Sequence, residues 1–496
     1  MNRWIAPLAL LALASCQDSP LPTAAPGTPL AAVASGGVID ADLAAALATA
    51  SASDQLQIVA TFDRAVTTVD ALGGAVMGLG AGVVGFGHLP MVAALATPEQ
   101  VGAIAALPGV QGVFLATVER PLNREAVTSV RADAVHVEGV TGKGVGVAIL
   151  DTGIDGTHPD LVFPTKTVQN VKAVANSKDV YEFEGRDPST GLKTPKPVKK
   201  GYEVWLENVE NTDNNNGHGT HVAGTAAGTG AASGGKYAGV APGAHLIGIG
   251  AAEGGVFPSF FILAGFDYIL EKRKEYNIQV VNNSWGSSPA KFNPDSPISI
   301  ATKEVHDAGI TVVFAGGNDG PAANTMNPRA VAPWVIAVAA GCKLGTDPTG
   351  SGVHCVDGDE RDGILADFSS RGIAGDPMYK PDVLAPGVHL VSTRASMGFD
   401  VSAFALPHDA RTCAIDAEHL AGYTCISGTS MAAPVVTGVV ALLEQATNGA
   451  ITPDQVLQVL TSTARRYPAY GEWEIGAGYV DAAAAVKVAR TSIAKR

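Results

Sequence analysis

The stretch Ile426-Ser-Gly-Thr-Ser430-Met-Ala-Ala-Pro434-Val-Val-Thr-Gly-Val-Val-Ala-Leu-Leu443 decides how the rest of the chain is interpreted. It carries no charge before Glu444 and is apolar on every side, which predicts a fully buried helix. Ser430 would lie in its first turn, where free backbone N–H groups and the positive end of the helix favour negative charge. That position suits a nucleophile, because the oxygen it attacks becomes negative in the transition state. The alternative is a serine that only caps a core helix.

Two motifs earlier in the chain carry side chains that can assist a nucleophile. Residues 144–150 have the pattern of a buried strand and lead into Asp151-Thr-Gly. His218-Gly-Thr-His221 stands at a glycine-rich turn before another small, apolar segment. An imidazole can take a hydroxyl proton, and a carboxylate can orient and stabilise the imidazolium. The two histidines could also face one metal ion, but the Glu of the H-E-x-x-H motif is absent.

These motifs, in the order Asp, His, Ser, resemble those of the subtilase family, the subtilisin-like serine endopeptidases. The resemblance covers roughly residues 125–490 and rests on Asp151-Thr-Gly, His218-Gly-Thr-His, Gly316-Gly-Asn318 and Gly428-Thr-Ser430-Met-Ala. It implies cleavage of peptide bonds through an acyl-enzyme, with Ser430 as nucleophile, His218 as base and acid, and Asp151 as orienting carboxylate. This chemistry requires no cofactor.

The resemblance also implies residues that surround the reacting bond. Asn318 is expected to donate its side-chain N–H to the oxyanion, together with the backbone N–H of Ser430. Two segments are expected to pair with the main chain of the substrate: Ser284-Trp285-Gly286 and Ala315-Gly316-Gly317. Asp160 matches a calcium ligand of many subtilases, so a structural calcium ion is possible. Residues 228–236 replace the loop that completes the site in those proteins, which puts this expectation in question.

After Asp151, buried strands alternate with helical segments, which predicts an α/β fold with a doubly wound, mostly parallel sheet. Ligands of such sheets gather at the carboxyl ends of the strands. Asp151, Ser284 and Asn318 each follow a predicted strand. We therefore expect residues 136–490 to form one catalytic domain in which these distant motifs meet.

A smaller α+β domain is expected at residues 54–118. Its segments read β-α-β-β-α-β, the ferredoxin-like arrangement, and Thr97-Pro98 provides a cap and first residue for the second helix. Its place ahead of Asp151 resembles that of the inhibitor propeptide of subtilases, which assists folding, occupies the active site and is cut away. The pattern alone fits any small α+β module. Residues 119–135 are expected to be a linker, with the maturation cleavage between 117 and 131.

Residues 1–15 have the features of a signal peptide, with Arg3 ahead of a short apolar core. Ala12-Leu-Ala14 fits an ordinary cleavage site, whereas Leu13-Ala-Ser-Cys16 resembles a bacterial lipobox that ends at a lipid-modified Cys16. We prefer the lipoprotein interpretation, in which residues 16–53 form a flexible tether. The apolar core is too short to span a bilayer permanently, and no later transmembrane helix is predicted. The protein is expected to be exported, either outside the cell or into the cell envelope.

The chain has five cysteines. Apart from Cys16 they fall into two close pairs, Cys342 with Cys355 and Cys413 with Cys425. In an oxidising compartment each pair is expected to form a disulfide; reduced thiols are the alternative, and the lack of C-x-x-C spacing argues against zinc.

The net charge of −14 and the lack of an apparent basic patch argue against nucleic acid or an anionic membrane as a partner. The expected partners are protein or peptide substrates and the chain's own propeptide. Membrane contact is expected only through a lipid on Cys16, and the protein is expected to be a monomer.

Two other functional classes remain. A catalytically silent subtilase-fold protein would bind peptides, but it has no need for Asp151, His218, Asn318 and Ser430 together. A lipase-like esterase would carry a G-x-S-x-G motif and a different order of catalytic residues. The sequence therefore favours a secreted serine endopeptidase that processes itself.

Overall fold

The structure is a computed structural model. It describes residues 37–116, 118–121, 128–174, 181–186, 193–197, 204–214, 216–253, 255–344, 353–354, 364–397, 409, 413 and 415–493. Cys16 and Cys355, expected to carry a lipid and a disulfide, lie outside these residues.

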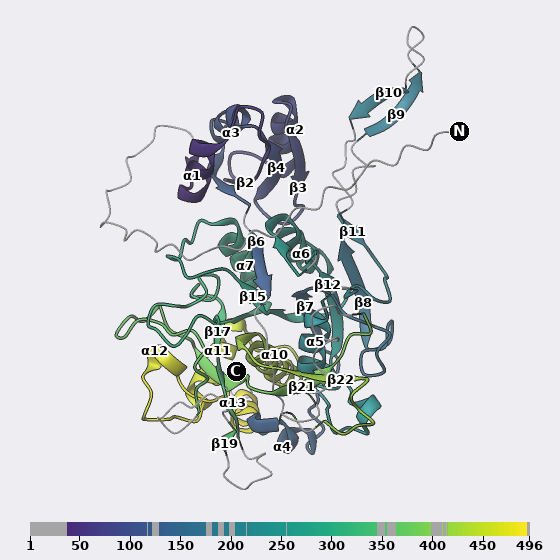
Figure 1. The fold of residues 1–496 in the computed structure, drawn as a ribbon, viewed down its shortest axis with the longest axis vertical. Coiled ribbons are helices and arrows are strands. Elements are labelled where there is room, and N and C mark those ends of the chain that lie inside the picture. Colours follow the sequence, from purple (N-terminus) through teal and green to yellow (C-terminus); the bar gives the residue numbers. More distant parts are fainter. Residues whose placement is uncertain are drawn as a thin grey trace. The chain divides into compact units, whose positions relative to one another are not determined.

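An eight-stranded sheet forms the centre of the larger domain, in the order β11-β8-β12-β7-β14-β16-β17-β20 (Figure 1). Neighbouring strands are parallel except β11 and β8, which are antiparallel. In sheet order the strands are Trp205–Leu206, Thr167–Ala173, His245–Gly250, Gly146–Asp151, Ile278–Asn283, Thr311–Ala315, Ile336–Gly341 and Val383–Pro386.

Side chains of the central strands alternate between two hydrophobic cores. In β7, Val147 and Ile149 belong to one core, whereas Ala148 and Leu150 belong to the other. This two-residue period follows from the pleat of a strand, and both faces are apolar because helices cover both. The predicted doubly wound parallel sheet is confirmed.

Each core is closed by its own set of helices. The first core includes residues of α4 (Ala132–His136), α5 (His218–Ala227), α10 (Thr429–Ala446), α11 (Pro453–Thr463) and α13 (Ala482–Ile493). The second includes residues of α6 (Ser259–Lys272) and α7 (Pro297–Asp307). A short helix, α12, spans Glu472–Ile475.

Helix α10 is the predicted central helix, and its residues are buried from Thr429 to Glu444. It packs against α5 and against β14, β16 and β17. By length and composition α10 would qualify as a membrane span. However, 89% of its apolar window is buried inside the fold, which is the setting of a core helix.

The smaller domain has the predicted order of elements. Its described sheet has the order β1-β5-β2-β4-β3. The elements are β2 (Leu56–Phe62), α2 (Val69–Gly78), β3 (Gly82–Gly85), β4 (Met91–Ala96), α3 (Pro98–Ala105) and β5 (Val110–Leu115). Thr97 caps α3 in a capping box with Gln100, as its sequence predicts.

The smaller domain begins earlier than expected. Strand β1 (Val38–Ile39) pairs with β5, and α1 (Ala41–Thr49) is capped by Asp40 and buries Leu43. The prediction of a flexible tether over residues 16–53 is therefore wrong for 38–49. The helix was missed because α1 is mostly alanine, so its apolar periodicity is weak.

The predicted linker, residues 119–135, also contains regular structure. Strand β6 (Val118–Pro121) pairs antiparallel with β13 (Phe257–Pro258) and β15 (Trp285–Gly286). Beyond it, the 3-10 turn η1 (Thr128–Val130) and α4 bury side chains in the first core. The linker boundaries are therefore wrong at both ends, because a strand and the start of the larger domain lie inside them.

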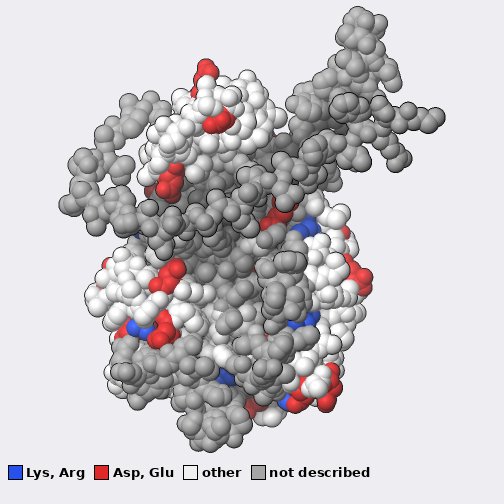
Figure 2. Space-filling view, in the orientation of Figure 1, with Lys and Arg blue, Asp and Glu red and all other residues white. Residues whose placement is uncertain are grey.

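Three two-stranded ladders complete the described elements: β9 (Tyr181–Arg186) with β10 (Lys193–Pro197), β18 (Lys343–Leu344) with β19 (Val353–His354), and β21 (Leu390–Thr393) with β22 (Tyr423–Ile426). Figure 2 shows that the described lysines and arginines on one face form small, separate patches, and that acidic side chains are scattered over the same face. This distribution agrees with the negative net charge.

Candidate active site

The three side chains predicted to carry the reaction come from three elements of the larger domain. Asp151 is the last residue of β7, His218 is the first residue of α5, and Ser430 is the second residue of α10. All three are buried. Since α10 packs on α5 and on the strands beside β7, the fold gathers these segments at the carboxyl edge of the sheet.

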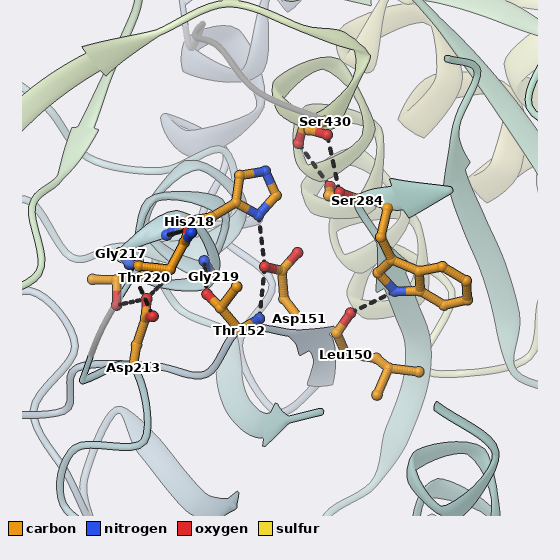
Figure 3. A network of polar contacts seen from close by, with 12 residues as sticks. Leu150, Asp151, Thr152, Asp213, Gly217, His218, Gly219, Thr220, Ser284 and Ser430 are labelled. Atoms are coloured by element: carbon orange, nitrogen blue, oxygen red, sulfur yellow. Dashed lines mark hydrogen bonds and ion pairs between the residues drawn. The ribbon is translucent and has the colours of Figure 1, made fainter. Parts of the chain in front are cut away.

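Asp151 and His218 form a direct hydrogen bond. Nδ1 of His218 lies 2.6 Å from Oδ1 of Asp151, and the same oxygen accepts the N–H of Thr152 at 2.8 Å. A carboxylate accepts, so the contact assigns the imidazole proton to Nδ1 and makes Nε2 the basic nitrogen. In Figure 3, Nε2 is turned away from Asp151, on the side of the ring where Ser430 lies.

A second buried carboxylate fixes the helix end that carries His218. The N-cap of α5 is Gly217, with φ 92°, which offers no capping side chain. Asp213 supplies the acceptors instead: Oδ1 accepts the Gly217 N–H at 2.9 Å, and Oδ2 accepts the N–H and hydroxyl of Thr220 at 2.9 and 2.6 Å. Burial raises the pKa of Asp213. The sequence motifs do not indicate this residue; its only signal is an acidic side chain five positions before His218.

Ser430 is held by Ser284, which follows β14. The Ser430 hydroxyl donates to the Ser284 carbonyl at 3.0 Å, and the Ser284 hydroxyl donates to the Ser430 carbonyl at 2.7 Å (Figure 3). Oγ of Ser284 also accepts from Nδ2 of Asn282 at 2.8 Å. One predicted substrate-binding segment is thus fastened to the first turn of α10.

The amide of Asn318 has a defined orientation. Its Oδ1 accepts the N–H of Thr429 at 3.0 Å and the hydroxyl of Thr429 at 2.9 Å. Because a backbone N–H can only donate, the accepting atom must be the amide oxygen. Nδ2 is then the atom that Asn318 can offer to an anion beside the N-terminus of α10, where the Ser430 N–H also lacks an intrahelical acceptor.

The two segments predicted to pair with substrate are linked by one buried side chain. Nδ2 of Asn327 donates to the Trp285 carbonyl at 3.1 Å and to the Ala315 carbonyl at 3.0 Å. Gly286 lies next to Trp285 in β15, and Gly316-Gly317 follows Ala315. No sequence motif indicates Asn327, because its partners are 42 and 12 residues away.

Neither of the two metal positions that the sequence suggested, the His218–His221 pair and Asp160, has the ligands that a metal ion needs. Burial lowers the pKa of His221 to about 3, which keeps its imidazole neutral. Nε2 of His221 lies 3.1 Å from the Leu390 carbonyl and Nδ1 of His218 lies 2.6 Å from Asp151, so these nitrogens bond to protein oxygens and not to a shared metal. Asp160 is fully buried, and both of its carboxylate oxygens accept hydrogen bonds. These contacts do not fit the oxygen-rich shell of calcium, so the expected calcium site is not supported.

One of the two expected cysteine pairs lies within the described residues. Cys413 and Cys425 are joined by a disulfide, with their Cα atoms 6.3 Å apart. Cys425 is in β22, five residues before Ser430. The disulfide therefore closes a short loop at the strand that leads into α10.

A buried Asp–His pair facing the first turn of the central helix, at the carboxyl edge of a doubly wound sheet, defines the class of subtilisin-like serine endopeptidases. Residues 142–481 match the model of the subtilase family, and the chain belongs to that family. The serine protease AprX of Bacillus subtilis (strain 168) is 31% identical over 376 residues, which cover 73% of this chain and 72% of AprX. Subtilisin Savinase of Lederbergia lenta is 30% identical over 364 residues, covering 73% of this chain and 97% of that protein.

A solved structure supports the fold assignment. The structure of fervidolysin from Fervidobacterium pennivorans, described as a keratinolytic enzyme related to subtilisin, superposes with a TM-score of 0.57 at 21% identity. The similarity covers 91% of this chain and 63% of fervidolysin.

Proposed function

We propose that this chain is the precursor of an exported serine endopeptidase that cleaves off its own N-terminal domain and then hydrolyses protein substrates. In this reaction Oγ of Ser430 attacks the peptide carbonyl carbon while Nε2 of His218 takes the hydroxyl proton. His218 returns that proton to the leaving amine, and Asp151 stabilises the imidazolium in between. Water then cleaves the acyl-enzyme with the same base. Nδ2 of Asn318 and the Ser430 N–H stabilise the oxyanion.

The observation that carries the proposal is the pairing of β6. In register, Val118 and Glu119 pair with Pro258 and Phe257 on one side, and Arg120 and Pro121 pair with Gly286 and Trp285 on the other. An extended peptide substrate recognised through its main chain would pair in this way.

The position of β15 explains why this pairing points to self-cleavage. Trp285 directly follows Ser284, which exchanges hydrogen bonds with Ser430. A chain that pairs along β15 in the direction of β6 therefore runs toward the nucleophile. This supports a maturation cleavage on the C-terminal side of β6, within residues 117–131.

The contacts of the N-terminal domain support its role as an inhibitor. Apolar side chains of this domain share the second core with α6 and α7; they are Val59, Phe86, Leu89, Met91 and Ala93. On α6, Asp267 accepts the backbone N–H groups of Gly87 (at 2.9 Å) and His88. Arg64 forms an ion pair with Glu304 of α7 at 3.3 Å. These contacts would hold the domain in place while β6 occupies the substrate position.

Export is supported by the leader-like residues 1–15 and by the disulfide between Cys413 and Cys425, because disulfides persist in oxidising compartments. A lipid on Cys16 would keep the precursor at the membrane surface.

The test compares the full-length wild type with Ser430→Ala, using Ser288→Ala, an exposed serine two residues after β15, as the control. We expect the wild type and Ser288→Ala to lose the N-terminal domain and digest casein, and Ser430→Ala to stay full length and inactive. Equal maturation and digestion by Ser430→Ala would show that Ser430 is not the nucleophile. Inactivity of all three would favour the catalytically silent peptide-binding protein.

A further inference from the structure

A buried carboxylate and a tyrosine join two distant segments of the larger domain. Asp160 lies in the loop after β7, and Tyr423 is the first residue of β22. The Tyr423 hydroxyl donates to Oδ2 of Asp160 at 2.7 Å, and the N–H of Ala232 donates to Oδ1 at 2.9 Å. Both side chains are fully buried. We propose that this Asp160–Tyr423 clamp replaces a calcium ion and fixes the strand leading to Ser430 without any metal.

The groups around Asp160 are donors where a calcium ion would need acceptors. Calcium takes six to eight oxygen ligands at about 2.3–2.6 Å. The phenol O–H and the Ala232 N–H instead direct hydrogens at the carboxylate. Two hydrogen bonds to an ionised acceptor stabilise the buried charge that the metal would otherwise balance.

Carbonyl groups of the adjacent turn, residues 228–236, accept backbone N–H groups of nearby residues. The Gly228 carbonyl accepts the N–H of Gly239 at 2.8 Å. The Gly230 carbonyl accepts the N–H groups of Ser233 and Gly235 at 3.0 and 2.8 Å. These carbonyl oxygens are therefore committed to closing the turn, which includes the 3-10 segment η3 (Ala231–Ser233).

A histidine forms a second link between the same two segments. Nδ1 of His158 accepts the N–H of Asp160 at 3.0 Å, which places the ring proton on Nε2. Nε2 then donates to the Gly422 carbonyl at 2.8 Å. The His158 ring also meets Tyr423 edge-on, with ring centres 5.6 Å apart. The clamp thus connects both the side chains and the backbone of the two segments.

The clamp lies between segments that carry the reacting groups. Asp160 is nine residues after Asp151, and Tyr423 is seven residues before Ser430. Movement of β22 relative to the loop after β7 would shift Ser430 relative to the Asp151–His218 pair. The clamp restrains that movement with side chains of the chain itself, so no ion has to bind first.

The experiment uses the full-length chain with Ser430→Ala as the parent, so that self-digestion does not affect the readout. The melting temperature is measured with calcium chloride and with EDTA for the parent, Asp160→Asn, Tyr423→Phe and the double variant. Tyr276→Phe is the matched control. It also removes a tyrosine hydroxyl, one that accepts a hydrogen bond from Gln169 at 3.2 Å and does not contact Asp160.

We expect the melting temperature of the parent to be the same in both buffers. Each clamp variant should lower it by about 2–6 °C, equally with and without calcium. The double variant should lose less than the sum of the two single losses, because both changes break one contact. Tyr276→Phe combined with Asp160→Asn should be additive.

Two results would overturn the proposal. One is a fall in melting temperature in EDTA that disappears in Asp160→Asn, which would make Asp160 a calcium ligand. The other is additivity of Asp160→Asn and Tyr423→Phe. A calcium effect that survives in Asp160→Asn would place the ion elsewhere, for instance at the exposed Asp416 and Glu418 with the half-buried His419, whose ligand atoms lie within 4.8 Å of one another. In that case non-additivity would still support the clamp.

Discussion

Ser284 and Ser430 exchange hydrogen bonds, with the hydroxyl of each serine donating to the carbonyl oxygen of the other. In the proposed reaction, the Ser430 hydroxyl must turn away from the Ser284 carbonyl to give its proton to His218. That rotation breaks only one of the two bonds. The bond from the Ser284 hydroxyl to the Ser430 carbonyl remains and keeps the helix start in place while Oγ moves.

Ser284→Ala should therefore loosen the first turn of α10. The substitution leaves the Ser430 carbonyl without this donor and Nδ2 of Asn282 without its acceptor. Unmet buried polar groups cost about 1–3 kcal/mol, so we expect a loss of that size in the free energy of unfolding. Urea denaturation in the Ser430→Ala background measures it. Ser288→Ala should change stability by less than about 0.5 kcal/mol; equal losses in both variants would contradict the assigned contact.

Asn318→Ala should slow turnover by roughly 10²–10³-fold with little change in KM, because an oxyanion donor acts mainly in the transition state. Thr429 orients this amide through its hydroxyl and N–H. Thr429→Ser keeps the hydroxyl and should retain most of the activity, whereas Thr429→Val should lower kcat. Steady-state kinetics on a peptide anilide provide the measurement. A rise in KM with unchanged kcat would assign Asn318 to ground-state binding.

Asp267→Ala should weaken the binding of the N-terminal domain to the larger domain. The substitution removes the acceptor for the N–H groups of Gly87 and His88. Hydrogen bonds to a charged group contribute about 1.5–3 kcal/mol, so release after processing should be at least tenfold faster. The delay before protease activity appears is the readout. Glu271→Ala changes an exposed carboxylate on the same helix and should leave the delay unchanged. An unchanged delay in Asp267→Ala would show that the Asp267 contact does not control release of the N-terminal domain.

Lys166 should make stability depend on pH. Its Nζ donates to the carbonyl groups of Pro242 (at 2.9 Å) and Ala244, and burial lowers its pKa to about 7, although Asp160 acts in the opposite direction. Below about pH 7 the folded state must bury an ammonium charge. Between about 7 and the ordinary value of 10.5 the unfolded state binds more protons, so stability rises with pH.

Lys166→Met removes this group. We expect the free energy of unfolding of the Ser430→Ala parent to rise, relative to Lys166→Met, as the pH increases from about 6 to about 10. Chemical denaturation at several pH values tests this. If the difference in unfolding free energy between the two proteins falls with pH, or stays constant, the pKa of Lys166 is not lowered in the folded state.

Local sequence patterns predicted the parts of the fold that local physics determines. The run of small and apolar residues at 144–150 predicted a buried strand, and Thr97-Pro98 predicted the start of α3. The motifs around Asp151, His218 and Ser430 predicted which segments would converge. They succeeded because a parallel sheet brings strand ends together wherever they lie in the chain.

The features that were missed depend on distant partners. Tyr423 meets Asp160 across 263 residues, and no periodicity signals such a contact. Strand β6 includes a proline, and its pairing partners are β13 and β15 on either side. The alanine-rich α1 gives little apolar contrast between its faces. These elements are specified by tertiary packing, which sequence patterns do not record.

The most direct test of the central claim is active-site labelling of the matured protein with a fluorophosphonate, followed by peptide mass analysis. Labelling requires a hydroxyl that a neighbouring base can deprotonate. We expect one adduct, on Ser430, and we expect the His218→Ala protein not to form it. A label on another serine, or equal labelling of the His218→Ala protein, would contradict it.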